Sequence, residues 1–416
     1  MFATILGLYL ANGPIRTVHA PSEPTSSVRI RGQVENARPL HYHLTPASLP
    51  RPFATESANN FPRVTARGNS TLKVAPGFTV TPWVEGLDRP RKMTVAPDGD
   101  VFVAESFAGR ITMLRSDKAG RVTKYTFTTE LRQPFGIGFY PPGPNPKFVY
   151  FANTNSVERH PYRNGDIQVR GTAEHLMDLP GGGYNQHWTR DLLFSPDGKR
   201  MFVTVGSASN ASPEDAPRAS ILVGNPDGTG FRTFASGIRN PVGLAIEPRT
   251  GELWAAVNER DRLGDDLVPD YATHVQAGGF YGWPYYYIGK NHDPRNPERP
   301  DLKARVLVPD VLLESHCAAL GIAFPAGKNS PFARDGFVSM HGSWNRSRRT
   351  GYKVVRVLLD AHGKAKGDYE DFVWGWKKSD DEVWGRPVDV QFDRTGAMLI
   401  SDDGNGTIWR VTPKRK

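Results

Sequence analysis

The chain has 416 residues, and its 52 Lys and Arg against 43 Asp and Glu residues give a formal net charge of +9. The basic residues are spread along the chain without a Lys/Arg block, which argues against nucleic-acid binding but is compatible with a small polyanionic ligand or an anionic surface. The single cysteine, Cys317, excludes an internal disulfide and any Cys-based zinc or iron–sulfur site. No run of about 18 apolar residues is present, so we expect no membrane insertion.

The first 70 residues show little hydrophobic periodicity. Residues 1–20 contain a short apolar stretch followed by Val-His-Ala, which fits either a signal peptide that lacks the usual positive n-region or a frayed N-terminus. Residues 21–70 are rich in Pro, Ser, Thr, Arg and Asn and predict an irregular N-terminal extension. From residue 71 to residue 416, short apolar strands alternate with turns, and we assign this range to one all-β domain.

The recurring unit of this domain is an apolar strand, a turn of the Pro-Asp-Gly type and a second strand. The 42 Gly and 35 Pro residues favour such turns over a helical bundle. The apolar residues next to the turn are Val95, Phe139, Phe194, Ile246, Phe324 and Phe392, at intervals of 44, 55, 52, 78 and 68 residues. A four-stranded unit of about 40–50 residues is typical of a propeller blade, so six copies predict a six-bladed β-propeller. A pair of β-sandwiches, with similar strand spacing, is the alternative.

Each unit is preceded by a polar segment, which we call its lead-in. The six lead-ins read GLDRPRK, LRQPFG, NQHWTRD, GIRNPVG, SHCAALG and WGRPVD. In a propeller these segments face the central channel at one end, so we expect them to converge on one pocket. Two sandwiches do not explain why polar residues recur at the same point of each unit. The segments GTIWRV and KVAPGFTVTPWVEG are expected to share one blade and close the ring.

His187, in the third lead-in, is a candidate general base, because imidazole titrates near neutral pH and needs only hydrogen-bond reach of the proton that it removes. A solvent-facing loop histidine is the competing interpretation, and the lead-in position favours the catalytic one. Arg239 and Asn240 open the fourth unit. Arg239 offers a planar fork of donors to a carboxylate or an oxyanion, and Asn240 adds a neutral donor; a buried turn-stabilising pair is the alternative.

Further polar residues occupy comparable positions, namely Gln133, His316, Arg346 and Arg386. Several guanidinium groups that point into one channel repel one another unless an anion compensates them. The pattern therefore predicts a ligand with more than one negative charge. For Arg346, which lies beside Arg348 and Arg349, a solvated basic loop remains the alternative.

An acidic loop follows a strand and contains Glu259, Asp261, Asp265, Asp266 and Asp270. Clustered carboxylates and backbone carbonyls provide oxygen ligands that suit Ca²⁺ better than zinc, although the spacing is not that of an EF-hand. An acidic loop without a metal is the competing interpretation. The next segment, AGGFYGWPYYY, can stack on a planar ligand or a sugar, but core packing between blades is favoured for most of its aromatic residues.

Four longer segments together resemble the glucose/sorbosone dehydrogenase family, and most closely its sorbosone dehydrogenase branch. They are RNPVGLAIEPRTGELWAAVNERDRLGDDLVPD, GGFYGWPY, HGSWNRSRRTGYKVVRV and GRPVDVQFDRTGAMLISDD. Members of this family are soluble six-bladed propeller quinoproteins that use pyrroloquinoline quinone (PQQ).

No Walker A loop, GxGxxG, HExxH or GxSxG motif is present, so nucleotide, zincin and serine-hydrolase functions lack their usual support.

The resemblance implies a PQQ- and Ca²⁺-dependent sugar dehydrogenase that is periplasmic or secreted and passes electrons to a cytochrome or quinone. It implies that His187 is the catalytic base and Arg239 its partner. Cofactor contacts are implied for Gln133, Asn240, His316, Arg346 and Arg386. Calcium ligands are implied near Glu259 and Arg260, largely through backbone carbonyls, and at the acidic residues Asp265 and Asp266.

Three positions depart from the soluble glucose dehydrogenases of that family. Gln186 stands where they have an acidic residue, His316 where they have a threonine, and Arg346 is the only candidate for a lysine of the fifth blade. Two other functions therefore stay open. A calcium-dependent lactonase would hydrolyse a lactone without any quinone, and a non-catalytic binding propeller would bind a glycan or protein without binding quinone.

Overall fold

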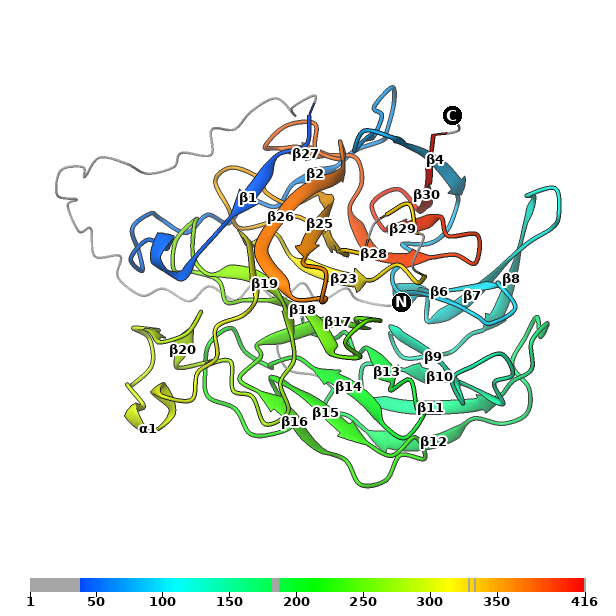
Figure 1. Ribbon diagram of the computed structural model, residues 1–416, viewed down its shortest axis with the longest axis horizontal. Coiled ribbons are helices and arrows are strands. Elements are labelled where there is room, and N and C mark those ends of the chain that lie inside the picture. The colour runs from blue at the N-terminus through cyan, green and yellow to red at the C-terminus, as the bar shows by residue number, and fades with distance from the viewer. Residues whose placement is uncertain (1–37, 182–186, 328–329, 333, 415–416) are drawn as a thin grey trace, which may run out of the picture. The chain divides into compact units, whose positions relative to one another are not determined.

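The computed structural model describes residues 38–181, 187–327, 330–332 and 334–414. The predicted signal peptide and Gln186 lie outside these ranges. Six antiparallel sheets follow one another along the chain, and the prediction of an all-β, six-bladed propeller is confirmed. The first strands of successive sheets contact each other in a closed cycle, so they line the central channel (Figure 1).

The first three blades are continuous four-stranded meanders. Blade 1 consists of β5 (Met93–Val95), β6 (Val101–Glu105), β7 (Arg110–Ser116) and β8 (Val122–Thr128). Blade 2 consists of β9 (Gly136–Tyr140), β10 (Phe148–Ala152), β11 (Ser156–Pro161) and β12 (Glu174–Asp178). Blade 3 consists of β13 (Leu192–Phe194), β14 (Met201–Val205), β15 (Ser220–Gly224) and β16 (Arg232–Ser236).

The last three blades carry additions. Blade 4 consists of β17 (Asn240–Ile246), β18 (Leu253–Asn258), β19 (Pro269–His274) and β22 (Val311–Ser315), and an excursion before β22 holds β20 (Tyr286–Tyr287), β21 (Asn291–His292) and helix α1 (Pro300–Lys303). Blade 5 consists of β23 (Ala319–Ala323), β24 (Gly336–Met340), β25 (Lys353–Leu359) and β26 (Ala365–Trp374). Blade 6 consists of β28 (Pro387–Phe392), β29 (Met398–Asp402), β30 (Thr407–Pro413) and β4 (Phe78–Val84).

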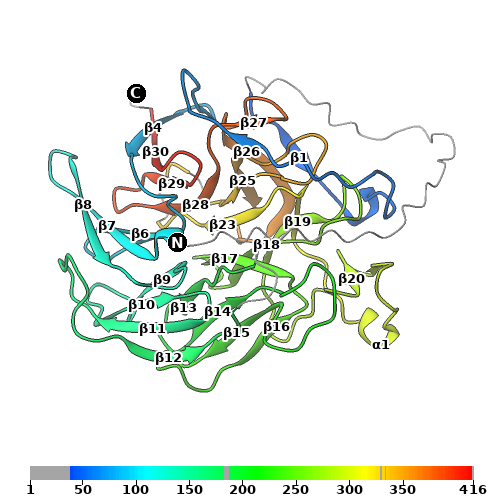
Figure 2. The same ribbon diagram turned by 180° about the vertical axis from the view of Figure 1, so that it is seen from behind.

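The ring is closed as the sequence predicts. Strand β4, which precedes blade 1, pairs antiparallel with β30 near the C-terminus, with Val84 opposite Ile408 and Phe78 opposite Pro413. This pairing gives blade 6 its outer strand and removes a free sheet edge. Both views show β4 beside β30 (Figures 1 and 2).

The extension that precedes the propeller is largely irregular but is attached to blades 5 and 6. Strand β1 (His41–His43) and strand β3 (Lys73–Val74) both pair with β26, while β2 (Arg63–Val64) pairs in parallel with β27 (Glu382–Val383). A short 3₁₀ turn, Pro46–Ser48, lies between β1 and β2. From residue 38 onwards the extension belongs to the same compact unit as the propeller.

The core lies between the blades, because most strands of a propeller are covered on both faces. Phe102 and Phe127 of blade 1, for example, pack with Ile137 and Phe151 of blade 2. The Pro-Asp-Gly turns reverse the chain through glycines in the left-handed region, with φ of 104° at Gly99 and 68° at Gly198. No helix in the described part of the chain is long and apolar enough to cross a membrane.

The two ends of the channel have opposite character. The ends of the innermost strands line an apolar cavity of about 420 Å³, and all six apolar residues that define the sequence repeat, from Val95 to Phe392, belong to its wall. The beginnings of the same strands line a polar cavity of about 550 Å³. The polar cavity is therefore where the six lead-ins meet.

Candidate functional site

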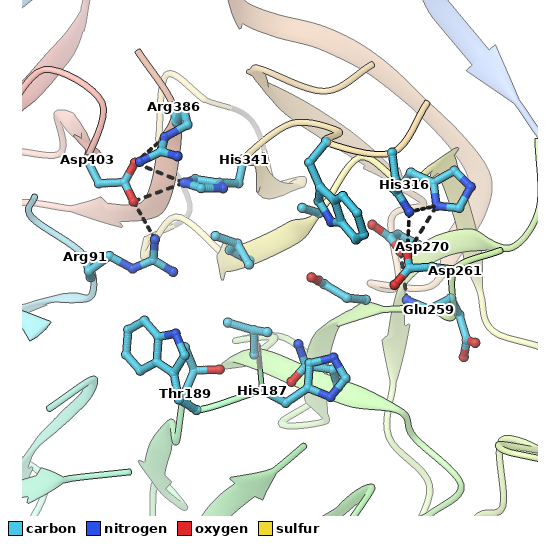
Figure 3. A pocket seen from close by; sticks show the side chains of 18 of the residues that line it. Arg91, His187, Thr189, Glu259, Asp261, Asp270, His316, His341, Arg386 and Asp403 are labelled. Carbon is cyan, nitrogen blue, oxygen red and sulfur yellow. Dashed lines mark hydrogen bonds and ion pairs between the residues drawn. The ribbon is translucent and has the colours of Figure 1, made fainter. Parts of the chain in front are cut away.

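The polar cavity receives at least one side chain from every lead-in, as the repeat predicts. These residues, in chain order, are Arg91, Gln133, His187, Arg239, His316 and Arg386. Each lies a few residues before an innermost strand, so convergence follows from the propeller geometry. Asn240, Glu259, Asp261, Asp270, His341 and Asp403 also line the cavity (Figure 3).

His187 is buried and held in one orientation. Its Nδ1 lies 2.8 Å from the carbonyl oxygen of Ser207 and 2.9 Å from the hydroxyl of the same residue. Because the carbonyl can only accept, Nδ1 carries the proton and the lone pair of the neutral ring is on Nε2. Burial, together with the charge of Arg239, lowers the pKa of His187 to about 3. The imidazole is therefore neutral at physiological pH, the protonation state that a general base requires.

Arg239 is fixed by acceptors from two different blades. Its Nε and Nη2 bond to the main-chain and side-chain oxygens of Asn210, at 3.0 and 2.8 Å. Its Nη2 also pairs with Asp261 at 3.1 Å, and its Nη1 donates to the carbonyl of Glu259 at 2.6 Å. Asn210 thus positions the guanidinium beside His187, and sequence reasoning did not identify it.

Asp261 lies at the centre of a charged group on the blade 4 side of the cavity (Figure 3). Its Oδ1 accepts a hydrogen bond from Asn345 at 2.8 Å and lies 3.5 Å from Nδ1 of His316. Burial opposes the charge of Asp261, but Arg239 and His316 hold the pKa of its carboxyl well below the usual range. The bond to Asp261 in turn raises the pKa of His316 against the effect of burial. Asp261 therefore bridges Arg239 and His316.

A second charged group, centred on Asp403, lies on the side of the cavity formed by blades 1, 5 and 6. Asp403 pairs with Arg91 at 2.6 Å, with Arg386 at 2.9 Å and with Nε2 of His341 at 3.0 Å. Burial, with the charge of Arg386, lowers the pKa of His341 to about 4 in spite of Asp403. Two guanidinium groups consequently face one carboxylate and a neutral imidazole, which leaves this group with an excess positive charge. Figure 3 shows Asp403 between its three partners.

The backbone of the cavity wall is unusual. Arg89, Gln133, His316 and Ala318 have φ values of 49°, 47°, 63° and 54°, in the left-handed region that residues other than glycine seldom adopt. Non-glycine residues in this region are concentrated at functional sites, where the surrounding structure holds them in place. The observation marks this end of the channel independently of side-chain chemistry.

The cavity wall also contains polar atoms without partners. Within the described chain these buried atoms include Arg91 Nε, Thr189 Oγ1 and Asn240 Oδ1. A buried polar atom without a hydrogen bond costs about 1–3 kcal/mol, so such atoms are expected where a ligand supplies the partner. Together with the excess positive charge at Asp403, they fit a polar, multiply anionic ligand. PQQ, a flat tricarboxylate, is of this class.

The structure brings together most, but not all, of the residues that the resemblance selects. Gln133, His187, Arg239, Asn240, Glu259, His316 and Arg386 line the cavity. Arg346 lies outside the cavity lining and pairs with the exposed Asp266. Asp265 also lies outside it and binds the amide and hydroxyl of Ser347.

The four residues expected to hold calcium do not form a set of ligands. Arg260 is fully buried, and it pairs with Asp293 and with the carboxylate of Glu259 rather than facing the cavity. The carbonyl of Glu259 accepts the hydrogen bond from Arg239, while Asp265 and Asp266 are engaged as described above. In the described ranges no three His, Cys, Asp or Glu side chains are grouped to hold a metal ion. The carboxylates of this segment therefore do not form a calcium site.

The aromatic segment after the acidic loop packs as the favoured interpretation expects. Tyr281, Trp283, Tyr286 and Tyr287 are buried. Trp283 donates to the carbonyl oxygen of Asn210 at 3.0 Å, the same oxygen that binds Nε of Arg239. The segment therefore contacts the site through Asn210 and does not line the cavity.

Comparisons with known proteins agree with the fold. The family model described as TrAA12-like matches residues 72–276 and 298–414. An uncharacterised protein of Borreliella burgdorferi is 28% identical over 353 residues, which cover 82% of this chain and 91% of that protein. The gap in the family match, residues 277–297, falls in the excursion of blade 4.

Two further relatives have informative descriptions. A pyrroloquinoline quinone-dependent pyranose dehydrogenase of Coprinopsis cinerea is 27% identical over 336 residues, covering 69% of this chain but only 44% of that protein. The holo structure of its PQQ domain superposes with a TM-score of 0.67 at 22% identity, covering 84% of this chain and all of that one. A calcium structure of a Trichoderma reesei family AA12 enzyme gives a TM-score of 0.72 at 19% identity, covering 85% and 99%. These two superpositions establish the shared fold.

Proposed function

The chain belongs to the TrAA12-like family, and from this premise we propose that it is a dehydrogenase that uses PQQ to oxidise a sugar or a sugar-derived alcohol or aldehyde. The observation that carries the proposal is the pairing of a neutral, oriented His187 with Arg239 in the wall of a cavity where two further guanidinium groups, of Arg91 and Arg386, share the single carboxylate of Asp403. We extend the proposal to an external electron acceptor, a cytochrome or quinone, and to a periplasmic or secreted location.

Residues of the cavity wall would hold the cofactor. Arg91 and Arg386 are the donors suited to its carboxylates, because both guanidinium groups share one counterion. Asn240, Thr189 and Gln133 line the same cavity and add neutral polar groups to its wall. When bound, PQQ supplies a two-electron acceptor for hydride.

His187 performs the proton transfer in this proposal. Its Nε2 takes the proton of the substrate hydroxyl while a hydride leaves the carbon that carries this hydroxyl. The carbon–oxygen single bond thereby becomes a carbonyl. The bond from Nδ1 to Ser207 keeps the lone pair on Nε2 and the ring in place. Arg239, held by Asn210 and Asp261, presents a fixed positive charge next to His187, where it stabilises negative charge that develops on an acceptor oxygen.

The proposal does not include a calcium ion, because the carbonyl of Glu259 and the carboxylates of Glu259, Asp265 and Asp266 are bonded to Arg239, Arg260, Ser347 and Arg346. Calcium enters the experiment as a variable.

The test is a titration of the purified apoprotein with PQQ, with and without Ca²⁺, followed by dye reduction with a panel of aldoses, disaccharides and sorbosone. We expect saturable PQQ binding and turnover of at least one substrate. His187→Ala should keep PQQ binding and lower turnover by about 10²–10⁴-fold. Absence of PQQ binding would overturn the proposal, and lactone hydrolysis without quinone would replace it. Preferential oxidation of sorbosone would place the chain in the sorbosone type.

A further inference from the structure

An exposed aromatic ring from the N-terminal extension lies at the mouth of the polar cavity. Phe61 lines the cavity, although it precedes the first strand of the propeller. Its ring stacks on Trp344 with centroids 4.8 Å apart and planes inclined by 15°. Phe61 is nevertheless 66% exposed, so burial on folding accounts for little of its presence.

The position of Phe61 is set by its neighbour Asn60. The amide nitrogen of Asn60 donates to the carbonyl of Trp344 at 3.0 Å, and its side chain donates to the carbonyl of Arg346 at 2.8 Å. Its side-chain oxygen accepts a hydrogen bond from Arg349 at 3.2 Å. Asn60 thus joins the extension to the loop that carries Trp344, and the two rings are held as one unit.

The mouth has a second aromatic wall, formed by blade 1 and the third lead-in. Phe107, 47% exposed, contacts Trp188 edge to face with ring centroids 5.4 Å apart. The guanidinium of Arg89 lies 4.3 Å from the centroid of Phe107. All three side chains line the same cavity as Phe61 and Trp344. The cavity is therefore charged and polar inside and aromatic at its mouth.

We propose that the Phe61–Trp344 pair binds a second sugar ring outside the cavity, so that the preferred substrate is a di- or oligosaccharide; this inference rests on the proposed function. The polar interior holds His187 and Arg239, where the reacting ring must lie. The aliphatic C–H face of a sugar packs on the face of an aromatic ring, and the exposed face of Phe61 is available to the next ring of the substrate.

The test compares Phe61→Ala with Phe53→Ala. Phe53 lies on the same extension and is 58% exposed, but it does not line the cavity, so its variant controls for loss of an exposed ring. With PQQ bound, kcat/KM is measured for cellobiose, maltose and melibiose and for glucose and galactose. For disaccharides that the wild type oxidises, we expect Phe61→Ala to lower kcat/KM about three- to tenfold, mainly through KM. The kcat/KM for monosaccharides should change less than twofold. Phe61→Tyr should have the wild-type kcat/KM for disaccharides.

Other outcomes would overturn the inference. If Phe61→Ala lowers kcat/KM equally for mono- and disaccharides, Phe61 contacts the reacting sugar ring instead. If Phe61→Ala no longer binds PQQ, the role of Phe61 is structural. If Phe61→Ala has the wild-type kcat/KM for disaccharides, Phe61 does not bind a second sugar ring. If the wild type oxidises no sugar, the proposed function fails, and tryptophan fluorescence titrated with the same sugars then decides the inference. Disaccharide binding that is weakened in Phe61→Ala but not in Phe53→Ala supports a sugar site at the Phe61–Trp344 pair, and absence of disaccharide binding rejects it.

Discussion

Arg239 Nη1 donates a hydrogen bond of 2.6 Å to the carbonyl oxygen of Glu259, the carbonyl near which the family resemblance expects calcium. A guanidinium at this distance directs positive charge at the lone pairs that a metal ion would use, and it repels a second cation. The imidazole of His316 lies on the other side of Asp261, with Nδ1 3.5 Å from its carboxylate. A guanidinium group of the chain itself therefore stands where the resemblance leads one to expect a metal ion.

We expect PQQ binding to be independent of calcium. Protein dialysed against EGTA and protein supplied with excess Ca²⁺ should bind PQQ with dissociation constants that agree within about twofold, because no described ligand set depends on the metal. Absorbance titration of the two preparations measures this. A tenfold or greater loss in EGTA that Ca²⁺ reverses would contradict the expectation.

Arg386 and Arg346 form a matched pair of arginines for a test of anion recognition. Arg386 faces the cavity and shares Asp403 with Arg91, whereas Arg346 pairs with an exposed aspartate outside it. Loss of a charge-assisted contact to a carboxylate is worth about 1.5–3 kcal/mol, so Arg386→Met should weaken PQQ binding about 10–100-fold. Arg346→Met should change it less than twofold. Equal effects of the two substitutions, measured by the same titration, would show that Arg386 does not contact the anion.

Asn210 is expected to act by positioning Arg239. Its side-chain oxygen accepts hydrogen bonds from Arg239 Nη2 and from the amide of Asp261, and both are lost in Asn210→Ala. We expect kcat to fall about five- to fiftyfold while the dissociation constant of PQQ stays within threefold, since the anion-binding group at Asp403 is untouched.

Asn225→Ala is the control for this prediction. Asn225 lies in the same blade, hydrogen-bonds within a turn to Thr229 and does not line the cavity. It should leave kcat unchanged. If Asn210→Ala lowers the unfolding temperature but keeps the wild-type kcat, the role of Asn210 is structural only.

The depressed pKa of His187 predicts a stability difference that depends on pH. The folded protein keeps this imidazole neutral down to about pH 3, whereas the unfolded chain protonates it near pH 6.5. Below pH 6.5 the unfolded state thus binds the extra proton, and the wild type loses stability relative to His187→Gln as pH falls towards 3. At pH 4.5 the difference, relative to pH 7.5, should be about 2–3 kcal/mol.

Urea unfolding of wild type and His187→Gln at pH 7.5 and 4.5 measures this difference. Other groups that titrate in this range, among them Asp270 with a pKa raised to about 6 by burial, are common to both proteins and cancel to first order. A difference that does not change with pH would mean that His187 protonates in the folded state near its ordinary value.

The strand repeat was sufficient to predict both the fold and the convergence of the lead-ins. It could not identify which residue of a lead-in faces the cavity. In GLDRPRK the cavity residues Arg89 and Arg91 are followed by Lys92, which turns away to pair with Asp191 at 2.9 Å and lines the apolar cavity instead. In the sequence these three cationic side chains look equivalent. Only the geometry of the strand directs Lys92 to the other cavity.

His341 and Asp403 were missed for a different reason. Both follow second strands, β24 and β29, and so fall outside the lead-in pattern. Because a second strand runs antiparallel to the innermost one, its end returns to the edge where the lead-in begins. The same rule accounts for Glu259 and Asp261, which follow β18. The ends of second strands are therefore a signal that would have found these residues.

Pairing between β4 and β30 has a consequence for how the cavity is assembled. Blade 6, which carries Arg386 and Asp403, is assembled from segments that lie before blade 1 and after blade 5 in the sequence. The four strands of each of blades 1 to 5 follow one another in chain order, whereas the Asp403 side of the cavity depends on pairing between distant segments. A variant that lacks β4 or β30 would therefore retain most of its sheets yet lack a complete blade 6 to hold Arg386 and Asp403 in place.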